Sequence, residues 1–442
     1  MKKFRIVYLV IIIAGLVLGW GIFGMKSLNA NSAVTQSLTA ARDYTERHLY
    51  EKAYQSYTEI LETNPDKEIM DEALAAMNSG VEDGEFSLSE LAEAYDNARI
   101  LFPKEYGYWA DLLEIYVNNS QFTRAYELNK EIVRNNISNE KIQEYSRKLL
   151  YSFTIKSRTY SVALRSPTGH YTVCKDDQWG VLQTNGDPFV DTDQIYVSPL
   201  SSDFESVYID ERGARLRNSS RVVQYIFNYE PEGIMGAVNG EIVPQYSSEN
   251  ERWKYFDCNQ EIFSDGEYED AAAFQNGYGL VKTGGQWKFV DTDFVIDDDI
   301  SFENIKLYQN REYAYLDTIV AKQEGTYRMF DANGKEINSF EAEDMDNYYG
   351  GLLAFKDESG LWGFVNRNGQ IVIEPAYKEA KSFAYGLAAV SDGEAWGFID
   401  QKGNLVIDYQ FRDAGYFNRD GLCSVSNLPD SYYFILLRYP NG

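Results

Sequence analysis

Tryptophan returns at a regular interval through the second half of the chain, each time at the head of a similar short stretch. Two of these stretches nearly coincide: WGFVNRNGQIVIEP begins at Trp362, and WGFIDQKGNLVIDY begins 34 positions later at Trp396. Related stretches begin at four further positions: Trp179, Trp253, Trp287 and Tyr327. Self-similarity at a nearly fixed period indicates a repeat architecture, in which one small supersecondary unit recurs and packs on its own copies.

The residues after each of these anchors predict the structure of the unit. Asp or Asn recurs four positions after the anchor and Gly recurs seven positions after it, as at Asp400 and Gly403. An Asp at the start of a turn bonds its own backbone, and Gly takes the positive φ that closes a hairpin. Apolar residues alternate on either side of this turn, which is typical of strands. Weaker copies start at Ser206 and Tyr432, and an aromatic residue recurs 21 positions after most anchors.

We expect the anchors to be repeated core that packs between adjacent units. The Gly that follows Trp predicts that a neighbouring strand or ring passes close to the backbone there. The predicted repeat core comprises Trp179, Trp253, Trp287, Tyr327, Trp362, Gly363, Trp396 and Gly397.

These residues resemble the WG repeat, a bacterial β-repeat family named for its Trp-Gly pair. The resemblance is most specific in the copies that begin at Trp362 and Trp396, and it covers about 260 residues. It implies an all-β repeat domain, often found beside tetratricopeptide or membrane segments. It implies little about activity, because the family is defined by its repeat and not by a reaction.

An array of sheets has to hide its edges, and a closed propeller does so by radial repetition. The chain ends soon after its last anchor, with YYFILL, and the β region begins with SVAL and YTVCK, which have no anchor before them. We expect these first strands to complete the last unit and to seal a propeller-like ring. An open β-solenoid is the alternative.

Residues 31–158 have a helical pattern, with apolar residues every three or four positions and few Pro or Gly. The spacing resembles the tetratricopeptide repeat, a helix–turn–helix of about 34 residues. The resemblance is carried by Ala41, Tyr44, Ala53 and Tyr57 in one copy and by Trp109, Leu112, Tyr116 and Ala125 in another. It implies a concave face that holds peptides or partner proteins. The alternative is a helical spacer.

Residues 1–30 are predicted to be an N-terminal membrane anchor. The 20 residues from Ile6 to Met25 carry no charge, which is long enough to span a bilayer as a helix. Basic residues precede this segment, so the positive-inside rule keeps the N-terminus cytoplasmic and places the bulk of the chain outside the membrane. A cleaved signal peptide is the alternative, but Leu28 stands where cleavage needs a small residue.

Charge and composition exclude several classes of function. The formal net charge of -27 repels phosphate backbones, so nucleic acid is not an expected partner. Cys174, Cys258 and Cys423 are widely spaced, which is typical of buried apolar cysteines. The two histidines, His48 and His170, lie in different predicted domains, and HExxH, Walker A and GxGxxG are absent from the sequence. The sequence therefore predicts no catalytic, cofactor-binding or metal-binding residue.

The sequence thus predicts three parts: an anchor at 1–30, a tetratricopeptide-like domain at 31–158 and a WG-repeat β domain at 159–442. We expect a single-pass protein of the cell membrane that acts outside the cytoplasm as a non-enzymatic interaction module. Its partner would be a protein, a peptide or a cell-wall component. The alternative is a carbohydrate-active enzyme or a glycan-binding protein that uses a pocket of the β domain. Converging carboxylates in that pocket would favour the enzyme, and packed aromatic residues would favour binding.

Overall fold

The computed structural model describes residues 27–229, 231 and 235–439, and the chain divides into two compact units, Met1–Leu149 and Leu150–Gly442. The predicted membrane span, Ile6 to Met25, lies outside the described residues. Within the described part of the chain, no helix combines the length and the apolar composition that a membrane crossing needs.

The first unit is built from helices that pack on their neighbours in chain order. In the described residues they are α2 (Ser27–Glu46), α3 (Tyr50–Thr63), α4 (Lys67–Glu82), α5 (Leu88–Leu101), α6 (Tyr106–Asn118), α7 (Phe122–Arg134) and α8 (Glu140–Leu150). Local signals set their ends: Asp66 accepts hydrogen bonds from the first turn of α4, and Ser87 forms a capping box with Glu90 at the start of α5. Pro65 follows α3, where a helix cannot continue.

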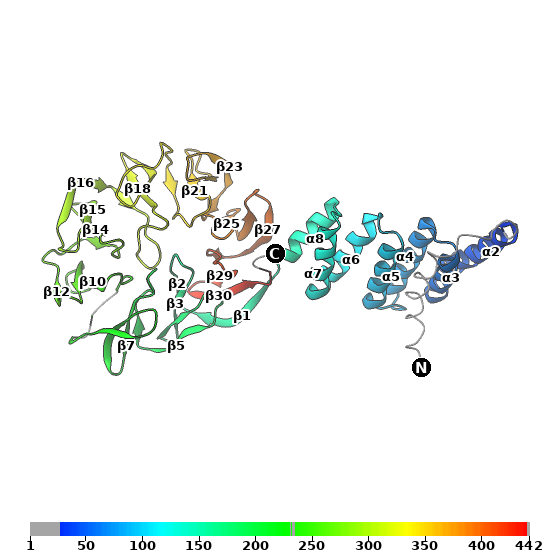
Figure 1. The fold of residues 1–442 in the computed structure, drawn as a ribbon, viewed down its shortest axis with the longest axis horizontal. Helices are drawn as coiled ribbons and strands as arrows, with labels where there is room; N and C mark the ends of the chain where they lie inside the picture. The colour runs from blue at the N-terminus through cyan, green and yellow to red at the C-terminus, as the bar shows by residue number, and fades with distance from the viewer. Residues whose placement is uncertain (1–26, 230, 232–234, 440–442) are drawn as a thin grey trace. The chain divides into compact units, whose positions relative to one another are not determined.

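The second unit is a ring of small antiparallel sheets, each of which we call a blade (Figure 1). Blade 1 is β2 (Val162–Arg165), β3 (Tyr171–Lys175), β4 (Gln178–Leu182) and β5 (Pro188–Gln194). Blade 2 is β6 (Tyr196–Val197), β7 (Ser206–Asp210), β8 (Gly213–Arg217) and β9 (Val223–Ile226). Blade 3 is β10 (Ile242–Ser247), β11 (Arg252–Asp257) and β12 (Ile262–Phe263). Blade 4 is β13 (Asp270–Ala271), β14 (Gly279–Thr283), β15 (Gln286–Val290) and β16 (Ile296–Phe302).

The remaining blades continue around the ring, so that the described residues form eight sheets. Blade 5 is β17 (Asn304–Ile305), β18 (Ile319–Gln323) and β19 (Thr326–Phe330). Blade 6 is β20 (Asp344–Met345), β21 (Leu353–Lys356), β22 (Trp362–Val365) and β23 (Ile371–Tyr377). Blade 7 is β24 (Glu379–Ala380), β25 (Leu387–Ser391), β26 (Trp396–Asp400) and β27 (Leu405–Phe411). Blade 8 is β28 (Asp413–Ala414), β29 (Leu422–Leu428), β30 (Ser431–Leu437) and β1 (Phe153–Tyr160).

The ring is closed by pairing of the first strand with the last. β1 pairs antiparallel with β30, with Phe153 opposite Leu437 and Ile155 opposite Ile435. The expected propeller-like closure is therefore confirmed and the open β-solenoid is wrong. The strand that closes the ring was predicted wrongly, because SVAL and YTVCK form β2 and β3 of blade 1. The β region begins at Phe153, ahead of the expected boundary between 158 and 159, because this earlier segment supplies the missing fourth strand.

The hydrophobic core of the ring lies between adjacent blades. One cluster joins Phe398 and Phe411 of blade 7 to Phe417, Val425 and Ile435 of blade 8, all of them buried. Each blade is apolar on both faces, so burying them requires a neighbour on each side. Radial packing of this kind brings the first strand of each blade toward the middle of the ring and leaves the fourth at the rim (Figure 1).

Candidate interaction site

The predicted anchors lie at or next to the start of the third strand of their blades, or of the second described strand in blade 3. Their strands are β4 for Trp179, β11 for Trp253, β15 for Trp287, β19 for Tyr327, β22 for Trp362 and β26 for Trp396. Four of these side chains are buried and two, Trp179 and Trp362, are half-buried. The anchors are spread around the ring, one to a blade, and do not converge on one site.

The Trp-Gly pair has a steric cause in the fourth strand. A Cβ added to Gly397 would lie 2.7 Å from the carbonyl oxygen of Ile407, and one added to Gly363 would lie 2.7 Å from the backbone nitrogen of Pro375. Gly180, which follows Trp179, meets the backbone of its fourth strand in the same way. In blades 1, 6 and 7 the fourth strand therefore approaches the third too closely for a side chain at this position.

A basic residue lies over the anchor ring in several blades and also joins one blade to the next. The Nζ of Lys381 lies 5.1 Å from the centre of the Trp396 ring and 2.9 Å from Oδ1 of Asp413, which begins blade 8. An equivalent set, at 4.7 and 2.7 Å, is formed by Lys306, Tyr327 and Asp344. The anchor thus supports a cation–π contact and an ion pair between blades.

Blade 3 has the same contact, but its cation comes from a distant loop. The guanidinium of Arg311 lies 4.1 Å from the centre of the Trp253 ring and pairs with Asp270, which begins blade 4. Gly236 takes the place that Lys381 has in blade 7, and a Cβ added there would lie 3.4 Å from the Cβ of Arg311. Because blade 3 has a glycine where blade 7 has Lys381, there is room for the Arg311 side chain above the Trp253 ring.

Arg311 belongs to the loop between β17 and β18, residues 306–318, which we call the axial loop. Figure 1 shows it reaching from blade 5 toward the middle of the ring. The side-chain oxygen of Gln309 accepts a hydrogen bond of 2.8 Å from the backbone of Arg165 in blade 1. Asn310 donates to the carbonyl oxygen of Leu200, which follows β6 of blade 2. The loop therefore bonds to blades on the far side of the ring.

Glu312 continues these contacts with a fully buried carboxylate. Its oxygens accept hydrogen bonds from the backbone of Ser202 at 2.7 Å, from the Ser202 hydroxyl at 2.6 Å and from the amide of Asn239 at 3.0 Å. Three donors offset much of the cost of burying this charge. Glu312 thereby fastens the axial loop to the segments that follow β6 and precede β10.

A second buried charge, Arg165, lies beside the axial loop. The residue is 1% exposed, its guanidinium lies 4.7 Å from the centre of the Tyr349 ring, and Nη2 donates to the carbonyl oxygen of Phe417. The Tyr349 and Tyr416 rings lie 4.2 Å apart, and the Tyr416 hydroxyl donates to Asp346 at 2.8 Å. The middle of the ring is therefore packed with side chains from several blades.

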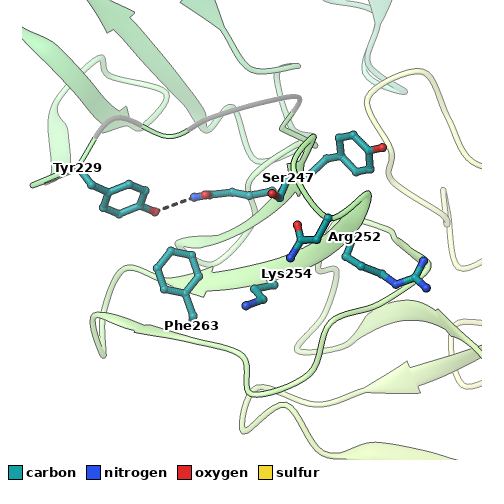
Figure 2. Close-up of a pocket in the computed structure, with 8 residues that line it drawn as sticks. Tyr229, Ser247, Arg252, Lys254 and Phe263 are labelled. Carbon is teal, nitrogen blue, oxygen red and sulfur yellow. Dashed lines mark hydrogen bonds between the residues drawn. The ribbon is translucent and has the colours of Figure 1, made fainter.

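An open pocket of about 310 Å³ lies at blade 3 (Figure 2). It is lined by Tyr229, Gln245, Tyr246, Ser247, Asn250, Arg252, Lys254 and Phe263. These residues come from the segment after β9, from the hairpin of β10 and β11, and from β12. Among the described residues, the lining combines aromatic rings, amides, hydroxyls and two basic side chains, without a carboxylate.

The polar side chains of this pocket differ in how far they are paired. Gln245 donates to the Tyr229 hydroxyl at 2.9 Å, as Figure 2 shows. Lys254 forms an ion pair with Glu267 at 2.9 Å. Arg252 is exposed and forms no ion pair with any residue that the structure describes. The arrangement suits apolar contact, hydrogen bonding and attraction of an anionic group.

The two histidines and three cysteines do not form a reactive site. His170 is 8% exposed beside Phe204, and burial lowers its pKa to about 4. The cysteines are free and buried, as expected from their spacing: Cys174, Cys258 and Cys423. No group of three or more His, Cys, Asp or Glu side chains suited to a metal occurs within the described ranges.

The tetratricopeptide-like residues lie in the helical unit, where they pack helix against helix. Six of them are buried and two, Tyr44 and Tyr116, are half-buried; the buried ones are Ala41, Ala53, Tyr57, Trp109, Leu112 and Ala125. Small residues such as Ala53 let neighbouring helices approach closely. These positions do not meet at a ligand site, and the tetratricopeptide assignment stays a prediction.

One predicted anchor was placed in the wrong strand. Ser206 lies in β7, the second strand of blade 2. In the third strand of that blade, Ala214 is opposite Ile209, which is the pairing that Trp396 makes with Ser391 in blade 7. Ala214 therefore holds the anchor place. The cause is a turn with Asp210 and Gly213, which here joins the second and third strands and elsewhere follows the third. The interval from Ser206 to Trp253, 47 positions, was the available signal of this error.

Sequence reasoning missed the axial loop, although the spacing of the anchors carries a trace of it. The interval from Trp287 to Tyr327 is 40 positions, against 34 from Trp253 to Trp287. The extra residues fall between β17 and β18, where the axial loop lies. Arg165 and Glu312 left no comparable signal, because nothing local marks a charged residue as buried.

Comparison with protein families finds one match, the WG containing repeat, at residues 255–287, 362–394 and 396–427. No curated protein matches the chain.

Among solved structures, BamB from Moraxella catarrhalis is 9% identical, with a TM-score of 0.41, 64% of this chain covered and 100% of that chain. Kluyveromyces lactis Hsv2 is 9% identical, with a TM-score of 0.34 and coverage of 62% and 93%. The Pan2 WD40 domain of Neurospora crassa is 11% identical, with a TM-score of 0.32 and coverage of 63% and 89%. These identities and TM-scores are too low to assign a fold or a role, and the propeller is established by the described sheets themselves. Three segments of the chain thus match the WG containing repeat, and the described sheets that include them are blades of a propeller.

Proposed function

We propose that the protein is a membrane-anchored interaction module that acts outside the cytoplasm and holds a protein or peptide partner without catalysing a reaction. The observation that supports this proposal is the lining of the blade 3 pocket, which includes Tyr229, Phe263 and Arg252, and Arg252 forms no ion pair among the described residues. Rings, amides and a cation supply affinity and orientation. Acid–base chemistry would need ionisable groups that converge on a substrate.

The anchoring part of the proposal is supported by the uncharged segment from Ile6 to Met25 and by the basic residues before it. The helical unit that follows is, in this proposal, of tetratricopeptide type. It serves either as a second binding face or as a spacer between the anchor and the propeller. Fusing a reporter enzyme that is active only outside the cytoplasm to the C-terminus tests the orientation, because the proposal predicts an active fusion.

The central test is capture of a partner by the full chain in intact envelopes. The tagged protein is crosslinked in place, solubilised in detergent and purified, and bound proteins are identified by mass spectrometry. The proposal expects one protein to recur across replicates and to be lost when Arg252→Glu and Phe263→Ser are combined in the pocket. Absence of any recurrent protein, together with cleavage of a glycan panel by the purified chain, would establish the carbohydrate-active alternative instead.

A further inference from the structure

The outer strands of most blades carry residues that discourage another strand from pairing with them. Charged residues or proline occur in β1, β5, β16, β23 and β27, at Lys156, Arg158, Pro188, Asp191, Asp193, Asp297, Asp298, Asp299, Glu374, Pro375 and Asp408. An unprotected edge strand presents a row of open backbone groups to other chains, and charge or proline is a common protection.

The outer strand of blade 2 lacks this protection. β9 reads VQYI, with neither a charge nor a proline, and it forms one end of its sheet. Val223 is 41% exposed and Ile226 is 67% exposed, while Val222 just before the strand is 56% exposed. An apolar, unprotected edge in a monomeric protein marks a place where another strand can add.

The charge around β9 is opposite to that of the whole chain. Residues 210–229 contain two acidic residues, Asp210 and Glu211, and four arginines, Arg212, Arg215, Arg217 and Arg221, in a protein of net charge -27. Arg215 pairs with Asp210, whereas the other three form no ion pair within the part of the chain that the structure describes. The guanidinium of Arg221 lies 4.7 Å from the centre of the Phe189 ring, close to the start of β9. This edge therefore attracts an acidic partner.

The edge also leads directly into the blade 3 pocket. Tyr229, which lines the pocket, follows the end of β9 by three residues, or about 10 Å of extended chain. Its ring lies 5.7 Å from the ring of Phe263 in β12, another outer strand without charge or proline. Arg252, which forms no ion pair among the described residues, also lines this pocket. The apolar edge, the pocket and the basic residues thus belong to the neighbouring blades 2 and 3 and to the segment that follows β9.

We propose that β9 and the blade 3 pocket form a docking site for an extended, acidic segment of a partner protein, which adds to β9 as a further strand. Backbone hydrogen bonds to β9 supply affinity, and apolar side chains of the segment pack on Val223 and Ile226. Carboxylates of the segment pair with the arginines beside the edge, such as Arg221, and with Arg252 in the pocket. This inference rests on the proposed function and names the chemistry of the partner. A second copy of the chain fits less well, because two whole chains of net charge -27 repel each other at long range.

The test selects a displayed library of random 12-residue peptides on the purified full chain in detergent, and then measures binding of an enriched peptide by fluorescence anisotropy. We expect acidic peptides with alternating apolar residues. Val223→Lys should weaken binding by at least about tenfold, because the lysine protects the edge. Arg252→Glu should weaken it by about tenfold through loss of a charge-assisted contact.

The matched control is Leu405→Lys in β27. Leu405 is 40% exposed, against 41% for Val223, and also lies in the fourth strand of its blade. This variant should bind the peptide within about twofold of the wild type, because it changes an edge that is already protected by Asp408. Amide hydrogen exchange should slow at residues 223–226 when peptide binds. Equal unfolding midpoints for the variants would confirm that the fold is intact.

Several results would overturn the inference. A library that enriches no peptide, or only basic peptides, would contradict the expected chemistry of the partner. Val223→Lys binding the peptide as tightly as the wild type, or protection from amide hydrogen exchange at residues other than those of β9, would contradict the docking site. A wild-type dimer that Val223→Lys dissociates would assign the edge to a second copy, and glycan binding lost in Arg252→Glu would assign the pocket to a sugar. If crosslinking captures the same partner with Val223→Lys as with the wild type, the proposed function stands and this docking site is wrong. If neither captures a partner, the proposed function itself fails.

Discussion

His170 shows how one buried side chain couples the stability of the ring to pH. It lies in blade 1 beside Phe204, where burial and the nearby Arg419 and Arg165 lower its pKa to about 4, partly opposed by Asp420. The ordinary pKa of histidine is about 6.5. Between these two values the unfolded chain binds a proton that the folded ring does not, so acid favours unfolding in this window.

We therefore predict that this histidine's contribution to the free energy of unfolding falls by up to about 3 kcal/mol as the pH is lowered from 6.5 to 4. Urea unfolding at several pH values, followed by tryptophan fluorescence, measures the effect. His170→Phe keeps the ring packed against Phe204 and removes the titration, so the variant should lose less stability over the same range. An identical pH dependence for wild type and variant would contradict the prediction.

At the scale of the elements, the contact of Lys381 with Trp396 and Asp413 explains how one blade holds the next. Lys381→Met keeps an unbranched apolar side chain over the ring but removes the charge. We predict a loss of about 1 kcal/mol in the free energy of unfolding, because an anchor cation–π contact and a partly exposed ion pair are lost together. Lys378 is exposed and forms no ion pair among the described residues, so Lys378→Met is the control and should be nearly neutral. A double-mutant cycle with Asp413→Asn isolates the ion pair, and zero coupling would mean that the pair contributes nothing.

β1 is the element on which closure depends, because it alone pairs with the open side of β30. We predict that residues 150–442 form a monomeric, cooperatively unfolding protein, whereas residues 161–442 aggregate. The shorter fragment exposes an apolar strand edge at the seam of the ring. Size-exclusion chromatography and thermal unfolding of the two fragments distinguish these outcomes. A monomeric, equally stable 161–442 fragment would show that the seam is not needed.

At the scale of the whole molecule, the axial loop joins blade 5 to distant blades through Glu312. Glu312→Leu leaves the buried donors of Ser202 and Asn239 without an acceptor. We predict a loss of about 3 kcal/mol in the free energy of unfolding, measured by urea denaturation. Glu312→Gln keeps one acceptor and should cost less, so equal losses for the two variants would contradict a role based on hydrogen bonding. Glu358→Leu, at an exposed position of blade 6 whose carboxylate forms no ion pair among the described residues, is a suitable surface control.

Local patterns made the repeat predictable. The Trp396-Gly397 pair reflects a steric limit set by the fourth strand of the same blade, and Asp400 with Gly403 forms a turn. Both features depend only on residues close in sequence. The same local signal misplaced Ser206, because an Asp-Gly turn is stable whichever two strands it joins. The blade 3 pocket was beyond this kind of reasoning, since Tyr229 and Phe263 meet only when two neighbouring blades pack together.

The sequence by itself determined the β unit, its period and its apolar anchors, because strand alternation and turn chemistry act over a few residues. Only the tertiary structure decided that β1 closes the ring and that Glu312 and Arg165 are buried at its centre. Those outcomes join positions such as 153 with 437 and 202 with 312. Contacts between positions so far apart in sequence depend on how many blades complete a circle, and that number follows from packing between sheets and not from any one repeat.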